Sequence, residues 1–240
     1  MKSAFFICLL FCQCCLGATT VFIGGVGDSI MMGTPTHTTA IYSSESGDLN
    51  NDVLYTMTRL YAVSPSYTNC GYGGHRWDQA PSDLQWCTNA NPTWILFHYG
   101  INDVYHDYTW SQQLPYIINC KAMCDAIGAK MILDDIFPDS NSTNIPDAKC
   151  LIIAQWNANY DLWASTNGVY RIHSHGAMGQ TRASTGNLDD LKAAYDSGDG
   201  VHLNNAGTAA WARIVYNWFL ANKSRIRAQT VRMMDLHMSQ

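Results

Sequence analysis

Short apolar segments and longer helix-like segments alternate along most of this chain, and that alternation restricts the fold more than any other feature. The apolar segments are typical of strands in a sheet covered on both faces, and they span residues 20–23, 94–98, 130–135 and 168–172, with a weaker one around 61–68. The helix-like segments span residues 50–61, 110–127, 146–164 and 206–220. This order predicts a three-layer α/β/α sandwich around a central, mostly parallel five-stranded sheet.

The chain is long enough to bury one full core. It has 240 residues, of which 47% are hydrophobic and only 14% charged. No repeat, low-complexity block or Pro/Gly-rich linker divides it. We therefore expect a single domain over residues 18–240, in which 223–240 form a helix extension or a loose end.

The first 17 residues, MKSAFFICLLFCQCCLG, have the layout of a secretory signal peptide, with a lysine, an apolar stretch and small residues at the end. We expect residues 1–17 to be removed and the mature protein to be secreted, in the periplasm or outside the cell. A buried amphipathic helix is the alternative. The apolar stretch is too short to span a bilayer comfortably as an anchor, and we expect no stable membrane insertion of the mature protein.

Charge and cysteine content restrict the partners and the compartment. The formal net charge of −5 argues against nucleic acid or an anionic membrane as the main partner, because both require a basic patch. For a chain in an oxidising compartment we expect one or two disulfides and a free thiol among the five cysteines after the signal peptide. These are Cys70, Cys87, Cys120, Cys124 and Cys150. The sequence does not determine the oligomeric state.

The first predicted strand runs into a glycine-rich turn within VFIGGVGDSIMMG, residues 21–33. A phosphate-binding loop would need a Lys-Ser/Thr pair after the glycines, and a dinucleotide turn would need a glycine where Ile30 stands. The G-x-S-x-G elbow of α/β-hydrolases would need a glycine in place of Met31. What remains is a serine, Ser29, at a strand-to-helix turn, where its hydroxyl projects into a cleft. The alternative is an ordinary helix N-cap.

A serine hydroxyl is a poor nucleophile unless a base takes its proton. The loop SGDGVHL at residues 197–203 offers Asp199 and His202, three positions apart. At this spacing the carboxylate can hold the tautomer of the imidazole while the other ring nitrogen faces Ser29. Taken alone, the pair is equally explained as a loop aspartate and a structural histidine.

Acyl transfer also needs hydrogen-bond donors for the oxyanion that develops on the substrate. GIND, at residues 100–103, follows a predicted strand and offers the side-chain amide of Asn102. NCGYGG, at residues 69–74, follows the weaker predicted strand and offers the backbone N–H of Gly74. Each segment alone has a simpler explanation as a turn.

Together, the blocks G-D-S, N-x-x-x-x-G, G-x-N-D and D-x-x-H resemble those of the SGNH, or GDSL, hydrolase superfamily, in the same order. The resemblance extends from Val21 to the last predicted helix. It implies a flavodoxin-like α/β/α fold and a carboxylic ester hydrolase that uses no cofactor. In this enzyme Ser29 would be the nucleophile, His202 the base and then the acid, and Asp199 the residue that orients His202.

The resemblance further implies an oxyanion hole made by the Ser29 N–H, the Gly74 N–H and the Asn102 amide. Met31 and Met32 depart from the small or hydroxyl residues that often follow the nucleophile in the family. This departure leaves the shape of the adjacent cleft wall undefined.

Aromatic residues follow the strand ends that carry these blocks. Trp77, Tyr99 and Tyr105 are candidates for stacking on a sugar ring, and Asp28 is a further candidate substrate contact, although we expect Asp28 and Asp103 mainly to support their loops. No long apolar lid segment is evident, which favours a small acyl group, in the first place acetyl, on a carbohydrate.

The alternatives within catalysis are a lysophospholipase or short-chain lipid esterase and an O-acyltransferase. Outside catalysis, the alternative is a carbohydrate-binding module on an inactive scaffold. We expect no metal, because His173 and His175 alternate along a strand without an acidic or cysteine partner nearby in the sequence.

Overall fold

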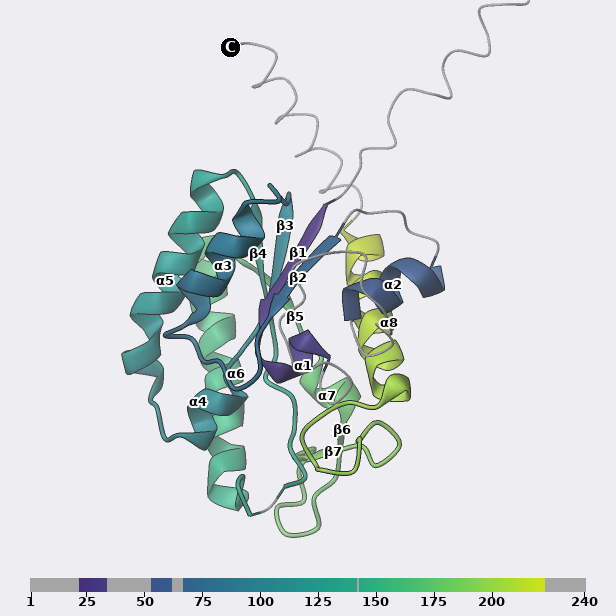
Figure 1. The fold of residues 1–240 in the computed structure, drawn as a ribbon. Helices are drawn as coiled ribbons and strands as arrows, with labels where there is room; N and C mark the ends of the chain where they lie inside the picture. Colours follow the sequence, from purple (N-terminus) through teal and green to yellow (C-terminus); the bar gives the residue numbers. More distant parts are fainter. Residues whose placement is uncertain (1–21, 34–52, 62–66, 142, 223–240) are drawn as a thin grey trace, which may run out of the picture.

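The computed structural model describes residues 22–33, 53–61, 67–141 and 143–222. The predicted signal peptide and the predicted tail at 223–240 lie outside the described residues. In the described part the chain forms a layered α/β fold (Figure 1).

A sheet of five parallel strands lies at the centre, in the order β2-β1-β3-β4-β5. The strands are β1 (Ile23–Gly27), β2 (Tyr67–Gly71), β3 (Trp94–His98), β4 (Lys130–Asp134) and β5 (Tyr170–Ile172). Gly27 at the end of β1 is level with Gly71 of β2 and His98 of β3. Because the strands are parallel, the segments that follow these three residues all emerge at the same edge of the sheet.

Helices cover both faces of the sheet, and the predicted three-layer sandwich is confirmed (Figure 1). One face carries α3 (Ala80–Thr88), α4 (Ile101–Tyr105), α5 (Trp110–Ala126) and α6 (Asp147–Asn167). The other carries α2 (Val53–Tyr61) and α8 (Asn205–Ala221), which pack against each other. With helices on both faces the central strands have no solvent side, so β1 and β3 are buried at every position.

The strand boundaries differ from the sequence-based ones where glycines or polar residues interrupt the apolar runs. The first strand was predicted at 20–23, but β1 spans Ile23–Gly27 and includes the glycines. Gly27 has to be a glycine, since a Cβ there would lie 2.6 Å from the carbonyl oxygen of His98 on the next strand. The weaker strand predicted at 61–68 is shifted likewise, because β2 begins at Tyr67 and continues through polar Asn69.

The predicted strand at 94–98 coincides with β3, and those at 130–135 and 168–172 differ from β4 and β5 by one or two residues. The predicted long helices match α5, α6 and α8 to within three residues at each end. The helix predicted at 50–61 ends at the same residue as α2. Helix α3 was not predicted, because its nine residues contain a proline in the first turn and show little apolar periodicity.

A segment without predicted structure lies between β5 and α8, beyond the carboxyl edge of the sheet. It contains α7 (His175–Met178) and a two-stranded antiparallel sheet of β6 (Gly179–Gln180) and β7 (Asp190–Leu191). Figure 1 places these elements at the same end of the sheet as α1 (Ser29–Met32), the turn after β1. This segment therefore lies at the edge of the sheet where ligands bind in such folds.

All five cysteines in the described residues are free and buried, so the expected disulfides are not formed in this structure. Cys120 and Cys124 lie one turn apart on α5 as buried apolar neighbours. No helix among the described residues is long and apolar enough to cross a membrane.

Candidate active site

Ser29 stands at the first position of α1, immediately beyond β1. Asp28 precedes it as the N-cap, and its Oδ1 accepts a hydrogen bond of 2.9 Å from the Ile30 N–H. The Asp28 N–H donates to the His98 carbonyl oxygen on β3, at 3.2 Å. The turn is thus held by the strands on which it stands, and Ser29 retains 9% of its surface exposed at the edge of the sheet.

His202 lies against Ser29 although 173 positions separate them in the sequence. Its Nε2 is 2.8 Å from the Ser29 Oγ, and its Nδ1 is 2.6 Å from Asp199 Oδ2. Because an ionised carboxylate can only accept, Asp199 fixes the proton on Nδ1 and leaves Nε2 free to accept the serine proton. The predicted triad of Ser29, His202 and Asp199 is therefore assembled.

The loop around Asp199 keeps its carboxyl ionised. Partial burial acts to raise the pKa of Asp199, but hydrogen bonds from the His202 backbone, the His202 ring and the Val201 backbone outweigh it and lower the pKa to about 2. The backbone N–H groups of Val201 and His202 both donate to Asp199 Oδ1, at 2.9 and 2.8 Å. Asp199 therefore remains a carboxylate over the pH range in which a histidine base works.

The predicted oxyanion-hole donors also have the required freedom. Among the described residues, the backbone N–H groups of Ser29 and Gly74 have no hydrogen-bond partner. The Asn102 Nδ2 donates one hydrogen to the His75 carbonyl oxygen at 3.0 Å. Since an amide carries two N–H donors, one remains for a substrate oxygen. The same bond ties Asn102, after β3, to the loop that carries Gly74, after β2.

Asp28 and Asp103 support the loops, as their position in the sequence indicated. Asp28 is fully buried, so it makes no substrate contact and that candidate role is wrong. Burial raises the pKa of Asp28 to about 7, against the opposing N–H groups of Ile30 and Met31. Asp103 is buried beside the loop of Gly74, where its Oδ1 accepts from the Trp77 N–H at 3.3 Å, and burial raises its pKa to about 7 as well.

Met31 and Met32 belong to the core. Both side chains are buried, and Met31 lies beneath Gly25 and Gly27 of β1. The Met31 carbonyl oxygen accepts a hydrogen bond of 2.7 Å from the Asn69 side chain, which links the nucleophile turn to β2. The methionines after the nucleophile thus anchor the turn.

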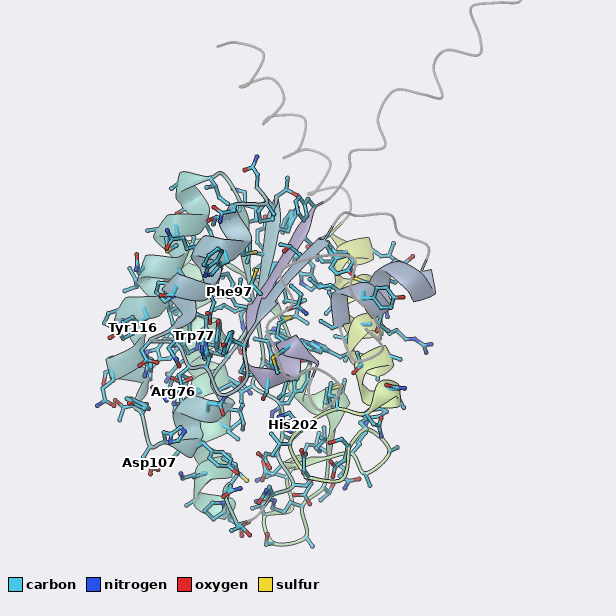
Figure 2. All side chains as sticks on the ribbon, in the orientation of Figure 1. Arg76, Trp77, Phe97, Asp107, Tyr116 and His202 are labelled. Carbon is cyan, nitrogen blue, oxygen red and sulfur yellow. The ribbon has the colours of Figure 1, made fainter. Side chains whose placement is uncertain are left out.

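Two of the aromatic residues proposed to contact substrate are core residues. Trp77 and Tyr99 are 0% and 1% exposed, and Figure 2 shows Trp77 directed toward Phe97 of β3, between the sheet and its helices. The Trp77 Nε1 donates to the Tyr160 hydroxyl at 2.6 Å, which satisfies its polar atom internally. The substrate-binding prediction is wrong for both, because their large rings fill the space between sheet and helices. Tyr105 is half-buried and keeps an accessible part.

A buried arginine, Arg182, holds the segment that faces the loop at residues 196–203, which carries Asp199 and His202 and is called the acid–base loop below. No sequence pattern singled out this arginine. Arg182 donates from Nε to Asp190 Oδ1 at 2.6 Å, from Nη1 to the Ile145 carbonyl at 2.9 Å, and from Nη2 to the Asp139 carbonyl. Ser140, which follows Asp139, donates its N–H to the Gly200 carbonyl in the acid–base loop at 2.8 Å. An isolated arginine carries no local signal for this role, because its partners come from distant segments.

No cluster of three or more metal-ligating side chains occurs in the part of the chain that the structure describes. His173 is largely exposed beside Asp135 and Asp161, at 3.7 Å from each. His175 Nδ1 contacts the Ile136 carbonyl oxygen at 2.8 Å.

Comparison with known proteins agrees with this arrangement. The model of the GDSL-like lipase/acylhydrolase family matches residues 26–210, which is most of the chain. The matched range contains every member of the triad and of the proposed oxyanion hole. A search of curated proteins found no sequence match.

Solved structures with the same fold include several members of this family. A GDSL-like lipase from Bacteroides thetaiotaomicron has a TM-score of 0.63 and 18% identity, over 83% of this chain and 88% of that one. A lipolytic protein of the G-D-S-L family from Veillonella parvula has a TM-score of 0.62 and 14% identity, over 83% and 98%. A mutant of Axe2, an acetyl-xylooligosaccharide esterase from a Geobacillus species, has a TM-score of 0.64 and 17% identity, over 82% and 93%.

At these identities the solved structures establish the fold, and the family model establishes the membership. With a hydrogen-bonded triad on that fold, the chain belongs to the GDSL-like lipase/acylhydrolase family, the SGNH hydrolases, and is a carboxylic ester hydrolase.

Proposed function

We propose that this protein is a secreted esterase that removes small acyl groups, in the first place acetyl, from carbohydrate. The observation that carries the hydrolytic part is the hydrogen-bonded chain from Ser29 through His202 to Asp199. Secretion rests on the signal-like sequence of residues 1–17.

The mechanism is acyl transfer in two steps. His202 Nε2 takes the proton of Ser29 as Oγ attacks the ester carbonyl, and the imidazolium then protonates the leaving alcohol. Water, deprotonated by the same nitrogen, attacks the acyl-serine, and the imidazolium returns the proton to Ser29 Oγ as the acid is released. In both steps the oxyanion accepts hydrogen bonds from Ser29, Gly74 and Asn102, which lie on three neighbouring strand ends.

The carbohydrate part of the proposal is supported by the side chains near the oxyanion-hole loop. Tyr72 is 42% exposed, and Tyr105 and Tyr108 are partly exposed, so aromatic side chains are available there to stack on a sugar ring. The similar Axe2 acts on acetylated xylo-oligosaccharides, which gives the proposal a precedent on this fold.

A panel of esters tests the proposal. The mature protein would be incubated with acetylated xylotriose, with ethyl acetate and octanoate, and with lysophosphatidylcholine, and the released acid would be measured. We expect acetate release from the sugar to have the highest kcat/KM and Ser29→Ala to abolish release from every substrate.

The other candidate activities give different results in the same panel. Faster cleavage of lysophosphatidylcholine or octanoate would replace the proposal with a lipid esterase. Transfer of acetate to an added sugar instead of to water would indicate an O-acyltransferase. If acid release is the same in Ser29→Ala, the release does not come from this site, and the result favours a carbohydrate-binding module on an inactive scaffold.

A further inference from the structure

The turn that contains Gly74, the predicted oxyanion glycine, carries a second group of side chains. Tyr72 and His75 flank Gly73 and Gly74, and their rings stack at 4.1 Å between centroids with an interplanar angle of 22°. The turn is closed by a hydrogen bond of 3.2 Å from the His75 N–H to the Tyr72 carbonyl oxygen. The two rings therefore form one platform beside the predicted oxyanion hole.

Backbone hydrogen bonds attach this platform to the catalytic groups on both sides. The Tyr72 N–H donates to the Gly27 carbonyl oxygen at 2.8 Å, two residues before the nucleophile Ser29. The His75 carbonyl accepts the hydrogen bond from Asn102. A substrate held on the platform thus lies next to the nucleophile turn and to the oxyanion donors.

The ring of His75 is fixed by a carboxylate. Its Nδ1 lies 2.8 Å from Asp83 Oδ2, and the same oxygen accepts the hydroxyl of Tyr99 at 2.7 Å. A carboxylate can only accept when ionised, so His75 carries its proton on Nδ1 and its Nε2 is an acceptor in the neutral ring. Nε2 has no partner among the described residues, and the His75 side chain is 20% exposed.

The other partner supplies an apolar face. Tyr72 is 42% exposed, and since one side of its ring covers His75, the accessible side faces away from the protein. The platform therefore combines a flat apolar surface with a hydrogen-bond acceptor that no residue in the described part of the chain occupies. This combination matches a sugar ring, whose C–H face stacks on an aromatic ring and whose hydroxyl donates to Nε2. An acyl chain would cover Tyr72 but leave Nε2 without a partner.

We propose that Tyr72 and the Asp83-held His75 form a sugar subsite that binds the alcohol part of the acetylated substrate. The inference rests on the proposed function and deepens it, because with an acetyl group the only large part of the substrate is the alcohol. A subsite of this kind binds the ring equally in the ground state and the transition state, so its loss raises KM and leaves kcat nearly constant.

The test compares two acetate esters, one with a sugar ring and one without. For acetylated xylotriose and ethyl acetate, kcat and KM would be measured for the mature protein and for Tyr72→Ala. The readout is the ratio of kcat/KM between the two esters. We expect this ratio to fall about tenfold, through KM for the sugar ester, which is the size of a lost aromatic contact.

A second variant separates the acceptor from the fixing of the ring. In His75→Asn the side-chain amide keeps a donor where Nδ1 contacts Asp83 but has no atom at the position of Nε2. We expect the ratio to fall about threefold to tenfold, as for the loss of one hydrogen bond, with an unchanged melting temperature. Tyr116→Ala is the matched control, because Tyr116 is similarly exposed at 39% but lies on the outer side of α5 (Figure 2).

The outcomes distinguish the subsite from the proposed function. If the unmodified protein cleaves acetylated xylotriose no better than ethyl acetate, the proposed substrate is wrong and the sugar subsite with it. If the unmodified protein prefers the sugar ester and the ratio is the same in Tyr72→Ala, in His75→Asn and in the Tyr116→Ala control, the proposed function stands and the subsite is overturned.

Discussion

The nucleophile and its base are held in place by different means. Ser29 and Asp28 stand on a turn whose backbone is bonded to the central sheet, and both are buried or nearly so. Asp199 and His202 lie on an exposed loop outside the sheet, closed by an isolated bridge between Asp196 and Leu203. The sheet fixes the nucleophile, whereas the base depends on the segments that pack against its loop.

Hydrogen bonds within the acid–base loop and to residues 140–141 hold the loop in place of the sheet. Asp196 Oδ1 accepts from the N–H groups of Gly198 and Gly200, at 2.8 and 2.9 Å. On the outside, Ser140 donates to the Gly200 carbonyl, and Asn141 Nδ2 donates to the Asp199 carbonyl at 3.3 Å. We therefore expect changes on the nucleophile side to affect chemistry alone, and changes near the loop to affect chemistry through position.

The largest expected effect is that of Ser29→Ala. Removal of the hydroxyl leaves no nucleophile, so kcat should fall by about 10⁴-fold or more, with an unchanged melting temperature. Asp199→Ala should cost less, about 10²- to 10⁴-fold, since His202 still contacts Ser29. Steady-state kinetics with ethyl acetate would measure both, and an equal or larger loss in Asp199→Ala would contradict the proposed difference between the two sides.

The next effect concerns the oxyanion hole, which joins the turns after β1, β2 and β3. Asn102→Ala removes a donor to the oxyanion, which typically costs about 2 to 4 kcal/mol, so kcat should fall about a hundredfold or more. KM should change much less, because the donor acts mainly in the transition state. Retention of full activity would remove Asn102 from the oxyanion hole.

A matched pair of glycines tests how the acid–base loop is held. Gly198 and Gly200 both have a positive φ, of 108° and 82°, so alanine is strained at either position. At Gly200 a Cβ would also lie 2.7 Å from the Asn141 backbone nitrogen, whereas at Gly198 it would meet nothing within 4 Å. Gly200→Ala should therefore push the loop away from residues 140–141 and displace the catalytic pair.

We expect Gly200→Ala to lower kcat about tenfold to a hundredfold, and Gly198→Ala to lower it by about threefold at most. Circular dichroism melting curves would show that both variants fold. Equal losses of kcat in the two variants would show that backbone strain alone, and not the contact with residues 140–141, determines the position of His202.

The same contrast explains what the sequence could predict. The nucleophile turn and the oxyanion-hole residues follow strands, and parallel strands bring such residues to one edge, so the site was predicted on Ser29, Gly74 and Asn102. The pair Asp199 and His202 was identified by its spacing and by family resemblance. From outside, this loop is held by Ser140 and Asn141, and Arg182 in turn fixes the segment before them. No local pattern connects these residues to the loop.

Burial was harder to predict than position. Trp77 and Tyr99 follow strand ends, as a substrate-contacting aromatic would, yet both face inward and donate to Tyr160 and Asp83. The sequence shows where a residue stands along the chain, but the direction of its side chain depends on the helices that pack against it. The prediction of the first strand at 20–23 missed most of β1 for a related reason. The glycines of β1 pack closely against neighbouring residues, and composition alone does not indicate such packing.

The smallest expected effect is a dependence of stability on pH. Burial raises the pKa of Asp28, Asp103, Asp134 and Asp139 to about 7 in the folded protein. Between about pH 4 and 7 the unfolded chain has therefore lost protons that the folded protein retains, so stability falls as the pH rises through this range. Asp199, with its pKa lowered to about 2, acts in the opposite direction, but only below about pH 4.

The melting temperature should thus be highest near pH 4 to 5 and several degrees lower at pH 7.5, as followed by circular dichroism. Asp134→Asn should flatten the curve, because it removes one buried titrating group. The amide oxygen can still accept from Ser174, which donates to Asp134 Oδ1 at 2.5 Å, but Trp211, which donates to Oδ2 at 2.5 Å, loses its acceptor, so the whole curve should also lie at lower temperature. In Asp199→Asn the curve above pH 5 should be unchanged, since that carboxyl titrates at lower pH. A melting temperature that rises steadily from pH 5 to 8 would show that these carboxyl groups are ionised in the folded protein. Water would then reach these buried groups more than their burial indicates.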